Sequence, residues 1–202
     1  MDLLIIYARF PEDEERGELM SFILNELQSK EISYIVRDLR EDLLKERVSE
    51  EKKSLSMALS ASRLLQQREI LKADKVIVIT SSKNDALPPE LDNFLDSVFT
   101  KEFMFNLIEG NLKTYSCRKQ FGIIRLDSEI EKLLHKSNKV EMDGDSYRKI
   151  LKDLNAEIKF NLLLPQKQAL NGLTKESQLE LKIALDCLIN SCDSHIPGKM
   201  PE

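Results

Sequence analysis

The sequence contains no tryptophan and few glycines, prolines and cysteines, and each shortage narrows the class of protein. Six Gly and six Pro in 202 residues exclude collagen-like chains and long Gly- or Pro-rich linkers. Three cysteines cannot all pair with one another, which disfavours a secreted disulfide scaffold and favours a reducing cytoplasm. No apolar run approaches the roughly 20 residues that a membrane helix needs, and Met1-Asp2 opens no signal peptide.

An excess of positive charge is also missing. The formal net charge is −5, which argues against non-specific binding to nucleic acids or anionic membranes, because both depend on clustered cations. Apolar residues make up 42% and charged residues 32% of the chain, a normal balance for a globular protein. The length suits one domain, which we expect to span residues 1–193, with a C-terminal tail at 194–202.

Short apolar runs alternate with segments of helical periodicity. Leu3–Tyr7 and Val76–Thr80 are continuous runs of β-forming residues, a pattern typical of strands buried on both faces. Further strands are predicted at 32–36, 121–126 and 158–164. Spacings of three and four residues predict helices around residues 19–27, 57–71, 91–98 and 147–154, and another from near Thr174, a plausible N-cap, to about Cys192.

Strands that alternate with helices predict an α/β fold with a parallel sheet and right-handed crossovers. Five strands favour a flavodoxin-like three-layer sandwich with strand order 2-1-3-4-5 and helices on both faces, rather than the six-stranded dinucleotide-binding arrangement. Such sheets bind ligands at the carboxyl ends of their strands, where the chain order reverses between strands 1 and 3. The segments 7–17 and 80–88 should therefore border one crevice.

These two segments carry the candidate binding residues, although neither contains a glycine-rich nucleotide motif. Arg9 and Arg16 lie in an acid-rich segment after the first strand, where they either neutralise a phosphate or form part of a solvated loop. The run Ser81-Ser82-Lys83-Asn84 follows the third strand and offers hydroxyls, a cation and an amide. This run suits either the ring of a flavin or a polar turn before the next helix.

Several motifs resemble the FMN-dependent NADH-azoreductases and the related flavodoxin-like NAD(P)H:quinone oxidoreductases. The run Leu91-Asp92-Asn93-Phe94-Leu95-Asp96, preceded by Asn84-Asp85-Ala86-Leu87-Pro88, is similar to the family stretch Y-N-F-N-I-P-x-x-L-K-N-Y-F-D. Phe103-Met104-Phe105 stands where the family has two aromatic residues spaced by one, and Val36-Arg37-Asp38-Leu39 matches the end of its second strand. The resemblance extends over roughly residues 3–187 and is strongest between 73 and 105.

The resemblance implies a function. It implies non-covalent binding of FMN, hydride transfer from NAD(P)H to the flavin and reduction of a quinone or azo compound in the same pocket. It also implies a homodimer and no catalytic acid or base. Arg9 and Arg16 would lie near the phosphate, and Ser81, Ser82, Lys83, Asn84 and Phe103 near the flavin ring.

The chain departs from the family in its three cofactor loops, and this leaves an alternative open. The phosphate-binding serines of the family fall on Ala8, Arg9, Glu14 and Arg16. The family's P-M-Y-N becomes Ser81-Ser82-Lys83-Asn84, which retains only Asn84, and its glycine pair after the fourth strand falls near Asp127-Ser128. The alternative is a flavodoxin-like paralogue that has lost FMN and acts as a non-catalytic binding or structural protein.

The cysteines and histidines indicate no metal site. Cys187, Cys192 and His195 form C-x4-C-x2-H, whose spacing is looser than that of zinc sites and which lacks a fourth ligand. We expect Cys187 to be a core residue, since it lies in an apolar helical stretch.

Overall fold

The fold alternates strands and helices along the whole chain. The computed structural model describes residues 2–8, 17–40, 55–82, 88–100, 103, 119–127, 157–166 and 172–190. The strands are β1 Leu3–Ala8, β2 Tyr34–Asp38, β3 Lys75–Ser82, β4 Gln120–Asp127 and β5 Glu157–Pro165. The longer helices are α1 Gly17–Ser29, α3 Leu55–Lys72, α4 Pro89–Val98 and α9 Lys175–Asn190. The helix expected around 147–154 lies outside the described residues.

The five strands form one parallel sheet in the order β2-β1-β3-β4-β5, which confirms the predicted topology. β1 lies between β2 and β3, so the chain order reverses at β1 as expected. The second strand begins two residues later than predicted, at Tyr34 instead of Ile32. Glu31 adopts a positive φ of 55°, and the Ile32 amide donates to the carbonyl of Leu27, so this segment still belongs to the turn that ends α1.

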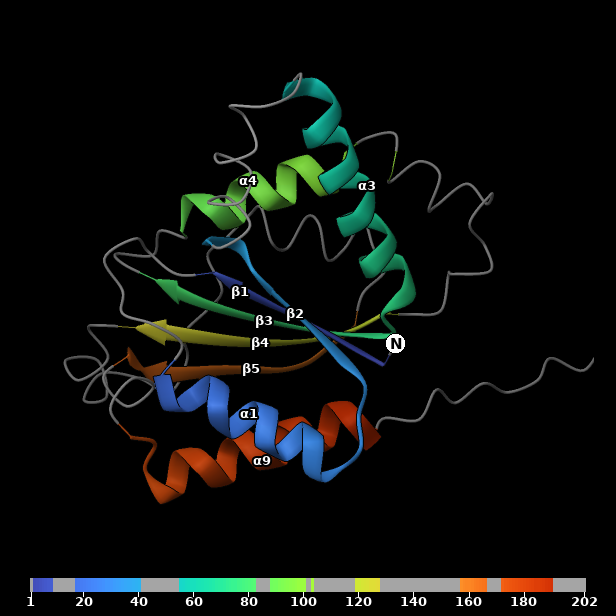
Figure 1. Cartoon of the computed structure of the whole chain (residues 1–202). Coiled ribbons are helices and arrows are strands. Elements are labelled where there is room, and N and C mark those ends of the chain that lie inside the picture. The colour runs from blue at the N-terminus through green and yellow to red at the C-terminus, as the bar shows by residue number, and fades with distance from the viewer. Residues whose placement is uncertain are drawn as a thin grey trace, which may run out of the picture.

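The helices cover both faces of the sheet, as predicted for a three-layer sandwich. Figure 1 shows α1 and α9 side by side on one face and α3 and α4 on the other. An ion pair between Lys30 and Asp186, at 2.6 Å, ties the end of α1 to α9. On the opposite face, the side chain of Gln67 in α3 donates to the carbonyl of Val98 at the end of α4 over 2.8 Å.

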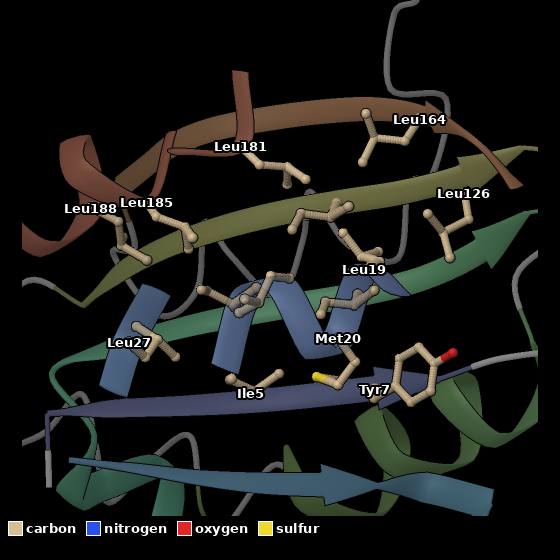
Figure 2. Packing of buried hydrophobic residues seen from close by; sticks show 14 of the residues in the cluster. Ile5, Tyr7, Leu19, Met20, Leu27, Leu126, Leu164, Leu181, Leu185 and Leu188 are labelled. Carbon is tan, nitrogen blue, oxygen red and sulfur yellow. The ribbon is translucent and has the colours of Figure 1, made fainter. Parts of the chain in front are cut away.

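The face covered by α1 and α9 holds the larger hydrophobic core. Figure 2 shows side chains from both helices pointing onto the strands, including Leu27 from α1 and Leu185 from α9. Ile5 in β1 belongs to this core and is fully buried. Thr174 caps α9 as predicted, because its Oγ1 accepts a hydrogen bond of 3.2 Å from the amide of Ser177.

The face covered by α3 and α4 holds a second core, to which α4 contributes Leu91, Phe94, Leu95 and Val98, all buried as their spacing predicts. α3 fits its sequence pattern less well, because Leu64 and Leu65 are 60% and 49% exposed. Its buried residues include Glu69, whose carboxylate forms a two-bond ion pair with the guanidinium of Arg37 in β2. A charged residue thus occupies a position on this helix that apolar periodicity alone would not find.

Two close contacts fix β4 in the sheet. Lys119, immediately before β4, is buried and donates from Nζ to the carbonyls of Leu71 and Ala73 at 3.1 and 2.5 Å, which satisfies the carboxyl end of α3. Gly122 lies against the ring of Phe160 in β5, in a space that a Cβ atom would overlap. The register between β4 and β5 shifts between Phe121 and Gly122, at this same contact.

Candidate functional site

The carboxyl edge of the sheet gathers the strand ends that the sequence assigned to a binding crevice. In the paired register, Ala8 at the end of β1 lies opposite Thr80 in β3, and Thr80 lies opposite Arg125 in β4. Beyond them, Ser82 lies opposite Asp127. Because α1 follows β1 on one face and α4 follows β3 on the other, the chain leaves this edge in opposite directions. A topological switch point of this kind is where open α/β sheets bind ligands.

The structure places some of the predicted site residues at this edge. Ser81 and Ser82 are the last two residues of β3. Ser81 is 1% exposed and pairs in register with Leu126. Arg9, Arg16, Lys83 and Asn84 lie outside the described residues, so their roles stay predictions; Arg9 follows Ala8, Arg16 precedes Gly17, and Lys83 follows Ser82.

Phe103 is placed in a different environment. Its ring is buried and packs edge-on against Phe99, with 6.2 Å between ring centroids and 62° between the ring planes. Phe99 follows the carboxyl end of α4, where its amide donates to the carbonyl of Leu95. Since α4 begins after the carboxyl end of β3 and runs back along the sheet for 10 residues, about 15 Å, Phe99 lies far along the helix from the switch point. A contact of Phe103 with a flavin stays a prediction.

A polar row that the sequence analysis missed runs along the α4 face of the edge. Thr80 is fully buried, and its Oγ1 donates to the carbonyl of Ser81 at 3.1 Å. Beside it, the Nε atom of Arg125 is buried and has no hydrogen-bond acceptor among the described residues. The same holds for Oε2 of Glu90, which lacks a donor in that part of the chain. The signal available in the sequence was an arginine inside an otherwise apolar run predicted to be a buried strand.

The helix starts near the edge differ from a glycine-rich phosphate cradle. α1 begins at Gly17, which has a positive φ of 47°, and Glu18 follows in its first turn. α4 begins after Pro88, which makes no side-chain cap hydrogen bond, and carries Glu90 and Asp92 in its first turn. Carboxylates in a first turn interact favourably with the helix dipole, but they also repel an approaching anion.

Two titratable side chains away from this edge have shifted pKa values. The hydroxyl and amide of Ser33 donate to the Asp2 carboxylate and lower its pKa. Asp186 accepts a hydrogen bond from Lys30 and raises the pKa of that ammonium group. Both interactions contribute to the fold and lie outside the candidate site.

The described part of the chain holds no cluster of three metal-ligating side chains. The expectation that Cys187 is a core residue is wrong, because its side chain is exposed on α9. The apolar residues around it alternate between the two sides of the helix: Leu181, Leu185 and Leu188 are buried, whereas Ile183 is exposed. Among the helices described, none has the length and apolar character needed to cross a membrane.

Comparison with known proteins identifies the fold. A family model described as a flavodoxin-like fold matches residues 1–124. No curated protein sequence matches significantly. Among solved structures, an FMN-dependent NADH-azoreductase from Bacillus anthracis in complex with FMN is 14% identical with a TM-score of 0.59, over 94% of this chain and 100% of that one. An NADPH-quinone reductase from P. pentosaceus is 14% identical with a TM-score of 0.57, over 95% and 100% of the two chains. A putative quinone reductase from Klebsiella pneumoniae is 18% identical with a TM-score of 0.59, over 92% of this chain and 82% of that one.

Proposed function

Since this chain belongs to the flavodoxin-like fold family, we propose that it is an FMN-dependent NAD(P)H oxidoreductase that reduces quinones or azo compounds. The observation that carries this proposal is the switch point between β1 and β3, where Ala8 at the end of β1 lies in register with Thr80 near the end of β3. The family motifs in the sequence and the similarity of fold to an FMN-bound azoreductase support it.

The residues at this edge fit a flavin in one respect that can be tested. Nε of Arg125 is a buried donor without an acceptor among the described residues, and a flavin presents carbonyl oxygens. Bound FMN would supply the redox chemistry, accepting a hydride from NAD(P)H and passing electrons to the acceptor. The protein would then bind and orient the reactants, and no side chain is required as a catalytic acid or base.

We assign the remaining predicted roles to the residues that flank the strand ends. Arg9 and Arg16 would neutralise the FMN phosphate near the start of α1. Ser81, Ser82, Lys83 and Asn84 would contact the ring from the end of β3, and the charge of Lys83 would stabilise the reduced flavin. Phe103 would cover the flavin of the partner subunit, since in its own chain it packs against Phe99 at the far end of α4.

The proposed setting is a homodimer in the cytoplasm that uses a small-molecule acceptor and binds neither nucleic acid nor membrane. The net charge of −5 supports the exclusion of both polyanionic partners. Its oligomeric state is measurable by sedimentation or by light scattering on the purified chain.

The visible absorption spectrum tests the function directly. The full-length protein is incubated with FMN, passed through a gel-filtration column and scanned before and after addition of NADH or NADPH. We expect a retained yellow chromophore that is bleached by one of the two nucleotides and restored by a quinone. A colourless protein after gel filtration contradicts the proposal.

A second candidate is a flavodoxin-like protein without FMN that acts as a non-catalytic binding or structural protein. The burial of Ser81 and the acidic first turn of α4 favour it, because both reduce the polar groups offered to a phosphate-bearing ligand. This candidate predicts that the protein remains colourless and does not oxidise NAD(P)H at any FMN concentration.

A further inference from the structure

Two charged side chains on the α4 face of the sheet, those of Arg125 and Glu90, are partly exposed, but each holds one buried atom without a hydrogen-bond partner among the described residues. Within the described residues, Nε of Arg125 has no acceptor and Oε2 of Glu90 has no donor. A buried polar atom without a partner costs roughly 1–3 kcal/mol, so folded proteins leave few of them. In this part of the chain, these are the two buried side-chain atoms left without a partner.

Both groups lie at the carboxyl end of the same face. Arg125 precedes the end of β4 by two residues, and it lies opposite Thr80 in the register. Ile123, two residues earlier, belongs to the core packed under α4, so the side chain of Arg125 leaves the strand on that face. Glu90 belongs to the first turn of α4. Its neighbour Leu91 is fully buried in the same core and packs this turn against the sheet.

Opposite charges at one end of one layer would ordinarily form an ion pair, but the structure shows none between Glu90 and Arg125. Elsewhere the same chain does pair such groups: Arg37 and Glu69 match both nitrogens to both oxygens between β2 and α3. The contrast indicates that Arg125 and Glu90 offer a free donor and a free acceptor to a third group. A fitting ligand would present an acceptor and a donor side by side.

We propose that Arg125 and Glu90 bind the pyrimidine edge of the flavin. The inference rests on the proposed function. That edge is a cyclic imide, in which the N3–H donor stands between two carbonyl oxygens. The guanidinium of Arg125 donates to the O2 carbonyl, and the carboxylate of Glu90 accepts from N3–H. The positive charge near O2 also stabilises the negative charge that the ring gains on reduction. Binding through these side chains does not depend on a glycine pair after β4.

The test combines two variants with three ligands. Arg125→Met keeps the length of the stem and removes the donors, and Glu90→Ala removes the acceptor. Arg68→Met and Asp96→Asn, on exposed positions of α3 and α4, are matched controls. Each protein is titrated by flavin fluorescence with FMN, with riboflavin, which lacks the phosphate, and with 3-methyl-FMN, which lacks the N3–H donor. The melting temperature of each flavin-free protein is measured in parallel.

We expect Arg125→Met to weaken FMN and riboflavin alike, by about 10–100-fold, which is the range for a hydrogen bond to a charged group. The wild-type protein should bind 3-methyl-FMN about 10-fold more weakly than FMN, whereas Glu90→Ala should bind the two equally. The flavin-free Arg125→Met protein should melt at or above the wild-type temperature, because an unmatched charge has been removed, and the controls should match wild type in affinity.

Three results contradict the inference, and they are distinguishable. If wild type and both variants bind FMN equally while both variants melt lower, Glu90 and Arg125 serve the stability of the fold and the inference fails alone. If the wild-type protein binds none of the three flavins, the proposed function fails and the inference fails with it. An effect of Arg125→Met on FMN but not on riboflavin would place the arginine at the phosphate and would also overturn the proposal.

Discussion

Replacing Gly122 with alanine should destabilise the sheet through one defined clash. An ideal Cβ at this position would overlap the ring of Phe160: Cε2 would lie 2.9 Å away, and two other ring atoms would lie nearer still. Real Cβ atoms essentially never approach a neighbour within 3.0 Å, so the ring must move. Phe160 packs against the core under α1 and α9 while remaining only half-buried, and its ring is therefore displaced towards solvent at the loss of part of that contact.

The magnitude follows from overpacking. Extra methyl groups in a packed site cost about 1–3 kcal/mol, and in a domain of about 200 residues each kcal/mol lowers Tm by roughly 2–4 °C. We therefore expect Gly122→Ala to lower Tm by roughly 2–12 °C in a melt followed by circular dichroism. The matched variant Phe160→Leu removes the clashing ring atoms, so alanine at 122 should cost less than about 0.5 kcal/mol in that background.

Two results would refute this reasoning. A Gly122→Ala protein with the wild-type Tm would show that the ring has free space into which to move. An equal loss of Tm with and without Phe160→Leu would show that the cost arises in the backbone of β4 rather than at the ring.

Three further changes test interactions of the fold. Glu69→Gln removes the charge from the carboxylate that accepts two hydrogen bonds from Arg37, so it should lower the free energy of unfolding by roughly 1.5–3 kcal/mol in a urea titration, and a loss below about 1 kcal/mol would show that other contacts of the arginine compensate. Thr174→Ala removes the N-cap of α9 and should cost about 1 kcal/mol in the same assay; Thr174→Ser, which keeps the oxygen, should restore most of it. The Ser33 hydrogen bonds lower the pKa of Asp2 below its ordinary value. This contact therefore stabilises the protein fully at a pH above the ordinary pKa of an aspartate, and the stabilisation is lost as the pH falls through the lowered pKa. Ser33→Ala should raise the pKa of Asp2 in an NMR titration, and an unchanged pKa would contradict the assignment.

The sheet was predictable from the sequence because its strands are buried on both faces. In a chain with alternating helical segments, short continuous runs of β-forming residues such as Val76–Thr80 are typical of strands covered by helices on both faces. The bounds of β2 were less accessible, since Ile32 is as good a strand former as Tyr34 and only the positive φ of Glu31 delays the strand. Turn geometry of this kind depends on how the preceding helix packs.

The candidate site was predictable in position but not in composition. The topological rule located the strand ends, and Ser81 and Ser82 do end β3, while every predicted contact with a ligand, theirs included, stays a prediction. Arg125 and Glu90 were missed because what distinguishes them is a buried side-chain atom without a hydrogen-bond partner among the described residues. Burial and hydrogen bonding of single atoms cannot be read from a sequence. The exposure of Cys187 was missed for a related reason, since an apolar neighbourhood in sequence does not say which side of a helix faces the sheet.

The order of the elements also has a consequence for synthesis on the ribosome. β1 lies inside the sheet, yet its neighbour β3 and the helix α9 that helps to cover its face come much later in the chain. At about 5–20 residues per second, translation of 202 residues takes roughly 10–40 s, and for most of that time the strand face beneath α9 is uncovered. A nascent chain arrested before residue 175 should therefore recruit chaperones, whereas a chain in which α9 has also emerged from the ribosome should not.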